Sequence, residues 1–572
     1  MSKINKIVGL GQLNPVPLDV DTNLINIEKL VQQAAKAKKK LLILPKNSLL
    51  GQIDRNLYSL LSLDNLISEA VSKLSVSLPP DLTVLIANDK PHIYDVNYFL
   101  LKKDGIISLQ DGDAFHLGGY TFFLNSSDIS TPLQYNIVLE NLFFADQGTI
   151  AMYIADMQIR SKNTIVLSSH GLVDGQFIYT GLAFISTNGH FDAFGRLFSY
   201  RSYNLVDDCV DTLIFNKSDK TEFLNTIEAL AFGLYDYLQK GKSKGYVISL
   251  SGGADSSLCS VLVCASQLYA LNELGFEEYR KALQNCGIDI GAKQTGSAAS
   301  FIREKVMKHV LTTVYQSTEN NSDSTFKAAN TLAEDIGSSH HNLSISAIIN
   351  SYTDAINETM DKKLSWDKND RTLQNIQARV RGPSAWMFAN KEDKLLIATS
   401  NFSELTVGYF TMDGDSVGGI APLGGIFKTK VLHLNRYLEK HGLEASNDDS
   451  TITLKGLALV NKLDPSAELR PGGKQTDEDD LMPYADLDFI AQSLYSGTLE
   501  QVLREEKDMK KRQYYFDCAK KVLRLYTTSQ WKRYRAAKSF FANTYTNSPL
   551  VPVVSDQFGC YLKSLKSTLH LK

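Results

Sequence analysis

The stretch "SLSGGADSS", residues 249–257, constrains the fold of this 572-residue chain more than any other segment. Apolar Val247, Ile248 and Leu250 supply a short strand, and the glycine pair that follows allows a tight turn that can approach a ligand closely. Asp255 then opens a helix, and the free N–H groups and dipole of a helix start favour an anion. The pattern therefore predicts an α/β domain built around a strand, a phosphate-binding turn and a helix.

A weaker interpretation of this stretch is a glycine turn followed by capping Asp and Ser residues. A bare Ser-Gly-Gly would favour that alternative, whereas the full S-G-G-x-D-S-S between a strand and a helix favours phosphate binding. The ending G-K-[ST] is missing, so the stretch is not a Walker loop. The predicted ATP- and pyrophosphate-binding residues of the loop are Ser251, Gly252, Gly253, Asp255, Ser256 and Ser257.

Length and composition limit the remaining possibilities. A chain of 572 residues predicts two or more domains. A net charge of -3 gives no reason to expect nucleic acid as a partner, and the apolar runs are too short to predict a membrane partner. The six cysteines have no paired spacing, which favours a reducing cytoplasmic location.

The order of predicted elements divides the chain into two parts. Residues 1–215 mix strands and helices in the rhythm of an α/β sandwich, with a first helix capped by Asp21 or Thr22. Residues 216–572 contain the phosphate loop and are predicted to form a second α/β domain. This domain ends in a helical, basic C-terminal extension. The acids of "TDEDD", residues 476–480, are predicted to open a helix and not to take part in catalysis.

The loop resembles the pyrophosphate loop of the ATP pyrophosphatases, which cleave ATP between its α and β phosphates. Downstream, "LQNIQARVRGPSAWMFANKEDKLLIATSNFSELTVGYFTMDGDSVGGIAPLGGIFKTKVLHL" and "DPSAELRPGGKQTDEDDLMPYADLDFI" closely resemble the synthetase core of NAD synthetases. This resemblance implies a Rossmann-like ATP pyrophosphatase domain that uses ATP and Mg²⁺. It also implies amidation of nicotinic acid adenine dinucleotide with ammonia through an adenylate, and assembly as a homo-oligomer.

Site residues follow from the same resemblance. Asp255 and Glu404 match Mg²⁺ ligands, a role that suits hard oxygen donors, and Lys428 matches the lysine on the ATP phosphates. Together with Asp415 of the substrate and ammonia site, they form the predicted catalytic set. Further ATP positions are Thr399 and Ser466, and the substrate-binding positions are Asn375, Arg379, Arg381, Asp415, Lys532 and Arg533.

Several of these residues have other interpretations. Glu404 and Asp415 could be exposed loop acids, and "WKRYR" could be a solvated basic helix. Arg379 and Arg381 are two positions apart, so on one helix they would not share a face. The chain also departs from the family pattern, because Phe402 replaces a lysine and Asp413 a tyrosine.

The first part of the chain resembles the nitrilase-like glutaminase domain of the long NAD synthetases, through "KIVGLGQLNPVPLDVDTNLINIEKLVQQAAKAKKKLLILP" and "SSHGLVDGQFIYTGLAFISTNGHFDAFG". Nitrilase chemistry needs a Glu base, a Lys at the oxyanion and a Cys nucleophile. The Glu position is Lys46 and the Cys position is Leu139. Cys209 lies too late in the domain to replace the nucleophile, and Lys102 and Lys103 are poor substitutes for the lysine. All three roles are therefore predicted to be lost.

Four functional hypotheses remain open at this level. The leading one is an NAD synthetase that uses free ammonia. The alternatives are a glutamine-dependent NAD synthetase, a related ATP pyrophosphatase that amidates another carboxylate such as nicotinic acid mononucleotide, and a non-enzymatic scaffold.

Overall fold

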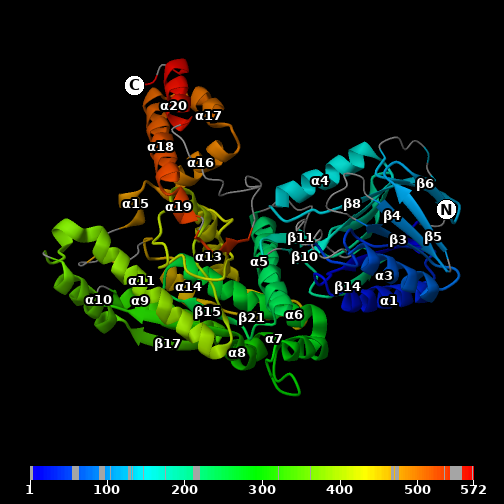
Figure 1. Cartoon of the computed structure of the whole chain (residues 1–572), viewed down its shortest axis with the longest axis horizontal. Coiled ribbons are helices and arrows are strands. Elements are labelled where there is room, and N and C mark those ends of the chain that lie inside the picture. Colours follow the sequence, from blue (N-terminus) through cyan, green and yellow to red (C-terminus); the bar gives the residue numbers. More distant parts are fainter. Residues whose placement is uncertain are drawn as a thin grey trace. The chain divides into compact units, whose positions relative to one another are not determined.

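A computed structural model describes residues 4–53, 63–88, 97–103, 105–126, 131, 133–145, 147–173, 175–209, 219–319, 321–360, 362–465, 469–470, 476–533, 535–540, 557–569 and 571 (Figure 1). The chain divides into two compact units, Met1–Asp236 and Tyr237–Lys572. The boundary predicted at residue 215 lies outside the described residues and stays a prediction. Each unit is described by itself below.

Unit 1 contains two six-stranded sheets. The first has the order β14-β1-β2-β3-β4-β5, with β1 parallel to β2 and antiparallel to β14. Its strands are β1 (Val8–Leu13), β2 (Leu41–Ile43), β3 (Thr83–Asn88), β4 (Asn97–Lys102), β5 (Gly105–Gln110) and β14 (Tyr203–Val206). The second has the order β13-β12-β9-β8-β7-β6. Its strands are β6 (Ala114–Leu117), β7 (Tyr120–Leu124), β8 (Gln134–Glu140), β9 (Thr164–Ser168), β12 (Ala183–Thr187) and β13 (His190–Phe194).

One buried cluster joins the facing sides of the two sheets. It takes Leu10 and Ile43 from the first sheet, and Ile137 and Ile165 from the second. A second cluster packs the other face of the first sheet against α1 (Val20–Lys36) and α3 (Asp64–Ser77). Helix α4 (Gln147–Arg160) buries Ile150 and Ile154. This arrangement is the predicted α/β sandwich.

Two further features complete unit 1. Strands β10 (His170–Val173) and β11 (Phe177–Thr180) form an antiparallel pair, and α5 (Asp219–Gly241) runs across the division between the units. The predicted cap of the first helix is wrong: Asp19, not Asp21 or Thr22, caps α1, with its carboxylate accepting from the Thr22 N–H at 3.1 Å. A cap lies just before the first helical residue, so a shift of the helix start moves the cap with it.

Unit 2 is built on a four-stranded parallel sheet with the order β17-β16-β15-β18. Its strands are β15 (Tyr246–Ser249), β16 (Leu311–Ser317), β17 (Ser339–Ser344) and β18 (Leu395–Leu396). Helices α6 (Ala254–Asn285) and α9 (Asp323–Ile336) pack against the sheet and against each other. Helix α11 (Trp366–Glu392) packs on the sheet through a cluster that includes Val247, Val314, Ala385 and Leu396. Layered helices around a parallel sheet are the predicted Rossmann-like architecture.

Short elements connect this core. Before the second strand come α7 (Ala298–Phe301), a π-helical turn (Ile302–Val306) and α8 (Met307–Val310). The later elements are α10 (Ser346–Thr359), α12 (Phe402–Val407), β19 (Ile420–Ala421), α13 (Lys428–His441), β20 (Leu443–Ala445), β21 (Ser450–Ile452), α14 (Lys455–Val460) and α15 (Asp477–Asp480).

The C-terminal part of unit 2 is helical, as predicted. Helices α16, α17, α18 and α20 lie together (Figure 1). They share a buried cluster that includes Leu487, Leu503, Val522 and Leu565. The elements are α16 (Tyr484–Tyr495), α17 (Leu499–Glu505), α18 (Met509–Thr528), α19 (Gln530–Arg533), β22 (Lys538–Ser539) and α20 (Gln557–Thr568).

Helix α6 is the one helix among the described residues that is long and apolar enough to cross a membrane by length and composition. Its most apolar window is 83% buried inside the molecule. Gly275, with φ 74° and ψ 166°, breaks the helix into two segments. A buried core helix can be as long and as apolar as a membrane-spanning helix. Because α6 packs against the sheet of unit 2, it is such a core helix.

Candidate functional site

The glycine-rich turn lies between β15 and α6, at the carboxyl end of a central strand, as the sequence predicts. The Ser256 hydroxyl oxygen accepts from the Ser251 N–H at 3.2 Å and lies 3.1 Å from the Ser251 hydroxyl. The Gly253 N–H donates to the Ser251 Oγ at 3.3 Å. Ser251 is exposed, whereas Ser257 is fully buried. Of the predicted hydroxyl donors, Ser251 is therefore the one placed to meet a ligand.

Gly252 is required by the geometry of this turn. Its φ is +84°, and a Cβ on its backbone would lie 2.3 Å from the carbonyl oxygen of Thr325 in α9. A left-handed φ and a backbone neighbour at that distance both exclude a side chain. The glycine therefore lets the turn pass against α9.

We expect Gly252→Ala to weaken ATP binding about tenfold or more, because the loop must move away from α9. We also expect it to lower the free energy of unfolding by about 1–3 kcal/mol. Isothermal titration calorimetry and denaturant unfolding measure the two effects. Gly291→Ala is the matched control, since Gly291 has φ +86° but no atom within 4 Å of the added Cβ. Equal ATP affinities for the two variants would contradict the role given to the close approach.

Three of the predicted catalytic residues meet beside the turn. The Lys428 ammonium contacts the Asp255 carboxylate and lies 3.4 Å from Glu404 Oε1. Asp255 lies in the first turn of α6, Glu404 in the first turn of α12, and Lys428 is the first residue of α13. Asn401 links two of them: its Nδ2 donates to Asp255 Oδ1 at 2.9 Å, and it forms a capping box with Glu404. Three helix starts thus converge on one ammonium group.

The electrostatics of this cluster are unusual for a surface loop. The Lys428 side chain is 4% exposed, against 16% for Asp255 and 15% for Glu404, so Glu404 is not an exposed loop acid. Burial would lower the pKa of Lys428, but the nearby carboxylates, Asp255 first, raise it above its usual value. Burial and the charge of Asp255 raise the pKa of Glu404, against the effect of Lys428. The cluster contains two carboxylates and one ammonium group. This excess of negative charge suits a site that binds a cation.

A buried acid and tyrosine next to the cluster were not predicted as site residues. Asp477 is 7% exposed and Tyr484 is 1% exposed. The Tyr484 hydroxyl donates to Asp477 Oδ2 at 3.1 Å, and the Lys428 Nζ lies 5.4 Å from the centre of the Tyr484 ring. The prediction that 476–480 opens a helix is confirmed, because Thr476 and Asp479 form a capping box. Burial, not spacing, distinguishes Asp477 from its neighbours, and burial cannot be read from a run of four acids.

The predicted substrate residues Asn375, Arg379 and Asp415 gather around one loop. The Thr411 hydroxyl donates to Asn375 Oδ1 at 2.9 Å, and the Thr411 N–H donates to Asp415 Oδ1 at 2.7 Å. The Arg379 Nε donates to the Met412 carbonyl at 3.1 Å. The loop and helix α11 therefore form one surface that carries all three side chains.

The remaining predicted residues make other hydrogen bonds near this surface, or lie elsewhere or outside the described residues. Arg381 donates to the Gln377 carbonyl of its own helix at 2.9 Å, so the two arginines differ in environment as expected. Lys532 Nζ donates to the carbonyls of Gly408 and Phe410 at 2.8 and 2.7 Å. Thr399 is half-buried between β18 and α12, and Ser466 lies outside the described residues.

Arg533 is 2% exposed and is therefore not part of a solvated basic helix. Its guanidinium donates to Ser529 Oγ at 2.8 Å and to the Thr406 carbonyl at 3.2 Å, and it stacks over Tyr526. These contacts link α19 to α12 and α18. A phosphate-binding role for Arg533 stays a prediction.

The structure shows what surrounds Phe402 and Asp413, the two residues that depart from the family pattern. Phe402, at the position of the family lysine, is 1% exposed, stacks with Tyr495 and meets Phe427 edge to face. Asp413 is exposed and lies 3.5 Å from Arg535. The lysine position has thus become part of an aromatic cluster.

In unit 1 the structure brings together the two positions that the sequence predicts as lost glutaminase residues, Lys46 and Leu139. Leu139 lies in β8, 4% exposed, in the core between the sheets. Two residues later, Asn141 Oδ1 accepts from the Ser169 hydroxyl at 2.6 Å, and the same hydroxyl lies 3.3 Å from the Lys46 carbonyl oxygen. Lys46 lies three residues after the end of the buried strand β2. The end of β2 and the end of β8 therefore meet, as the resemblance to nitrilases implies.

The other candidate groups of unit 1 are differently placed. Cys209 is exposed and lies beside the Phe191 carbonyl, 3.7 Å from its oxygen. Lys102 and Lys103 are exposed at the end of β4.

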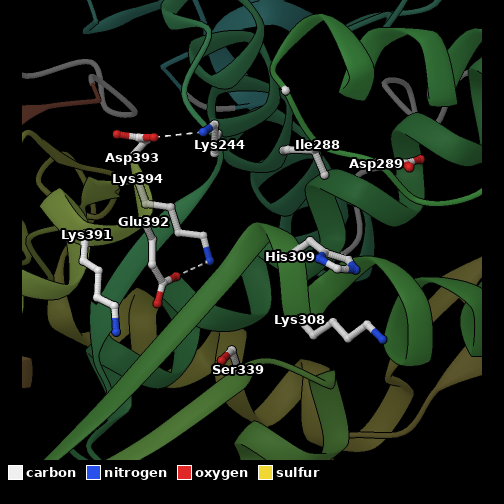
Figure 2. A pocket seen from close by; sticks show the side chains of 11 residues that line it. Lys244, Ile288, Asp289, Lys308, His309, Ser339, Lys391, Glu392, Asp393 and Lys394 are labelled. Atoms are coloured by element: carbon white, nitrogen blue, oxygen red, sulfur yellow. Dashed lines mark hydrogen bonds and ion pairs between the residues drawn. The ribbon is translucent and has the colours of Figure 1, made fainter.

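A hollow of about 490 Å³ lies at the opposite, amino edge of the sheet of unit 2 (Figure 2). Lys394 pairs there with Glu392 at 2.7 Å and Lys244 with Asp393 at 2.8 Å, while Lys308 and Lys391 lie on opposite sides of the hollow. Lys308 and Lys391 belong to the last turns of α8 and α11, where a cation suits the helix dipole. The charges of the hollow therefore have a structural explanation, and no predicted site residue lines it.

Comparison with known proteins agrees with this geometry. The NAD synthase family matches residues 226–536. A glutamine-dependent NAD(+) synthetase of Oryza sativa subsp. indica is 33% identical over 300 residues, which cover 48% of this chain and 38% of that protein. A glutamine-dependent NAD(+) synthetase of Acinetobacter baylyi is 24% identical over 93% of this chain and 94% of its own length. The crystal structure of a glutamine-dependent NAD(+) synthetase from Cytophaga hutchinsonii has a TM-score of 0.81 at 26% identity, covering 98% of this chain and 99% of that one.

A parallel sheet with a glycine-rich turn at its carboxyl edge, beside two acids and a lysine, defines an α/β nucleotide-handling domain. Here it follows a two-sheet sandwich, and the similarity to the Cytophaga hutchinsonii structure extends over both. The family match covers more than half of the chain, and the chain belongs to the NAD synthase family.

Proposed function

We propose that the protein is an NAD synthetase that uses ATP to amidate nicotinic acid adenine dinucleotide through an adenylate, releasing AMP and pyrophosphate. The observation that carries the proposal is the convergence of Asp255, Glu404 and Lys428 beside the glycine-rich turn, in a chain of the NAD synthase family. A carboxylate is a poor electrophile, so its activation by ATP must precede the attack of ammonia. The activation gathers several negative groups and requires positive charge near the phosphates.

The donor set fits Mg²⁺, which usually binds one or two carboxylates together with substrate phosphates. Among the described residues no three His, Cys, Asp or Glu side chains gather as a complete metal site, but Asp255 and Glu404 supply two neighbouring carboxylates. When bound there, Mg²⁺ would neutralise phosphate charge. Lys428 would contribute its own charge to the phosphates, and the turn would bind them through N–H groups and the Ser251 hydroxyl.

We further propose that the nitrogen comes from free ammonia, or from ammonia delivered by a partner, and that unit 1 does not hydrolyse glutamine. The nucleophile position is Leu139, whose side chain is packed between the sheets, and the base position is Lys46. A leucine cannot attack an amide, and a lysine cannot accept the proton of a thiol as a carboxylate does. Unit 1 would then serve folding, contacts between copies, or regulation.

Purified protein with ATP, Mg²⁺, nicotinic acid adenine dinucleotide and ammonium chloride tests the reaction. We expect NAD, AMP and pyrophosphate in equal amounts. Nicotinic acid mononucleotide in place of the dinucleotide is the matched comparison, and its preferential amidation would assign the site to another carboxylate. Absence of pyrophosphate release with both acceptors would favour the scaffold hypothesis.

We also propose that the protein is a homo-oligomer. Helix α10 has no buried residue, and its exposed apolar side chains recur at every fourth position. They are Ile348, Tyr352 and Ile356, followed by Met360 at the C-cap of the helix. A second copy that covered this stripe would remove it from water.

We expect Tyr352→Glu to shift the protein toward the monomer, because it places a charge in the centre of the stripe. Sedimentation velocity over a range of protein concentrations measures the shift. Ser351→Glu adds the same charge on the same helix beside the stripe and serves as the control. An unchanged assembly in the Tyr352 variant would exclude α10 from the contact.

A further inference from the structure

The surroundings of the Lys428 ammonium include more than its two carboxylate partners. The Tyr484 ring lies on the ammonium with a separation of 5.4 Å between Nζ and the ring centre. At this distance the face of an aromatic ring attracts a cation. Because Tyr484 is 1% exposed, its ring is a fixed wall of the site and not a mobile surface group.

Asp477 fixes the orientation of that ring. Its Oδ2 accepts from the Tyr484 hydroxyl at 3.1 Å, and both residues are buried. Glu478 of the same short helix accepts from the Tyr484 N–H at 2.9 Å. The tyrosine is therefore held at its backbone and at the far end of its ring by helix α15.

Asp488 lies one turn after Tyr484 on α16, so the two side chains share a helix face. One carboxylate oxygen of Asp488 accepts from the Ser403 hydroxyl, and the other accepts from the Thr429 N–H at 2.9 Å. The Ser403 Oγ in turn accepts from the Lys428 N–H at 2.8 Å. One face of α16 thus holds both the backbone and the ammonium end of Lys428.

We propose that Tyr484 and Asp477 are positioning residues that direct the Lys428 ammonium to the phosphate side of the loop, while Asp488 fixes its backbone. Lysine has four rotatable side-chain bonds, so a free ammonium would occupy many positions. The ring face and the carboxylates of Asp255 and Glu404 surround the ammonium and limit the positions that it can take. This inference rests on the proposed function for one point only, that Lys428 meets the ATP phosphates.

The test measures ATP affinity by isothermal titration calorimetry with Mg²⁺ and without the dinucleotide. We expect Tyr484→Leu, which removes the ring face, to weaken ATP binding about tenfold. Tyr484→Phe keeps the ring face but removes the hydrogen bond to Asp477, and should weaken ATP binding about threefold. Asp477→Asn weakens the same hydrogen bond and also removes a negative charge that acts on Lys428, so the two variants separate the bond from the charge. Asp486→Asn is the control, because Asp486 lies on the same helix but accepts from Tyr514 of α18 at 2.8 Å.

A double-mutant cycle separates positioning from a purely structural role. In a Lys428→Met background, Tyr484→Leu and Asp477→Asn should no longer change ATP affinity, because the group they position is gone. The same fold-losses with and without Lys428 would overturn the inference. If Tyr484→Leu does not fold, the cycle of Tyr484→Phe with Lys428→Met decides the question, because Tyr484→Phe changes no charge near Lys428.

The outcomes also distinguish this inference from the proposed function. Wild-type protein that does not bind ATP would contradict the proposed function. Wild-type protein that binds ATP but amidates neither dinucleotide nor mononucleotide would contradict the reaction and leave the positioning intact. Losses of ATP affinity that are the same with and without Lys428 would contradict only the positioning role of Tyr484 and Asp477.

Discussion

Ammonium should support NAD formation by the purified protein, whereas glutamine should support it at less than about a hundredth of that rate. The expected difference is large because amide hydrolysis in the nitrilase manner depends on a covalent nucleophile, and general-base activation of that nucleophile alone contributes a factor of about 10²–10⁴. Position 139 carries a buried leucine and position 46 a lysine. The measurement compares NAD formed with ammonium chloride and with glutamine, and follows glutamate release in parallel.

Cys209→Ala is the control for this prediction. Cys209 is the only cysteine that precedes the phosphate loop, and it is exposed on a segment away from β8. The variant should keep the ammonium-dependent rate. Equal rates from ammonium and glutamine in the wild type would contradict the loss of the glutaminase, and a loss of the glutamine rate in Cys209→Ala would then identify the nucleophile.

Lys428→Met should lower kcat/KM for ATP by about a hundredfold to a thousandfold, the usual effect of removing one fixed positive or hydrogen-bonding group from a developing charge. It should also lower the free energy of unfolding by about 3–5 kcal/mol, because Asp255 and Glu404 lose their cation while they stay largely buried. Steady-state kinetics and urea unfolding measure the two effects.

A second variant separates the two effects. Lys428→Met combined with Glu404→Gln should recover part of the stability, because one buried charge is removed, and none of the activity. Lys430→Met removes a lysine from the same helix, two residues away, and should leave the ATP kinetics near wild type. Recovery of activity in the double variant would mean that Lys428 acts only by balancing Glu404.

The parts of this molecule that the sequence predicts well are those set by local chemistry. The strand, turn and helix around Gly252 follow from neighbouring residues, and so does the helix start at Thr476. The prediction missed Asp19 as the cap of α1 because several Asp and Thr residues lie within one turn of the helix start, and each of them can act as a cap.

What the sequence could not supply depends on tertiary packing. Asp477 stands among four consecutive acids and differs from them only in being buried next to Lys428. Arg533 lies in a basic run, yet the fold turns its guanidinium toward carbonyl groups. Neither placement has a periodicity or spacing that single-sequence reasoning can detect.

The burial of Leu139 has a consequence for how unit 1 can change over time. An active site keeps reactive polar groups at some cost in stability, whereas a leucine in the core between two sheets adds to stability. A reversion to cysteine would remove core volume first and would gain no chemistry until a base and an oxyanion group also returned. The proposed loss of the nucleophile would therefore be hard to reverse in single steps, and selection at this position would act on packing.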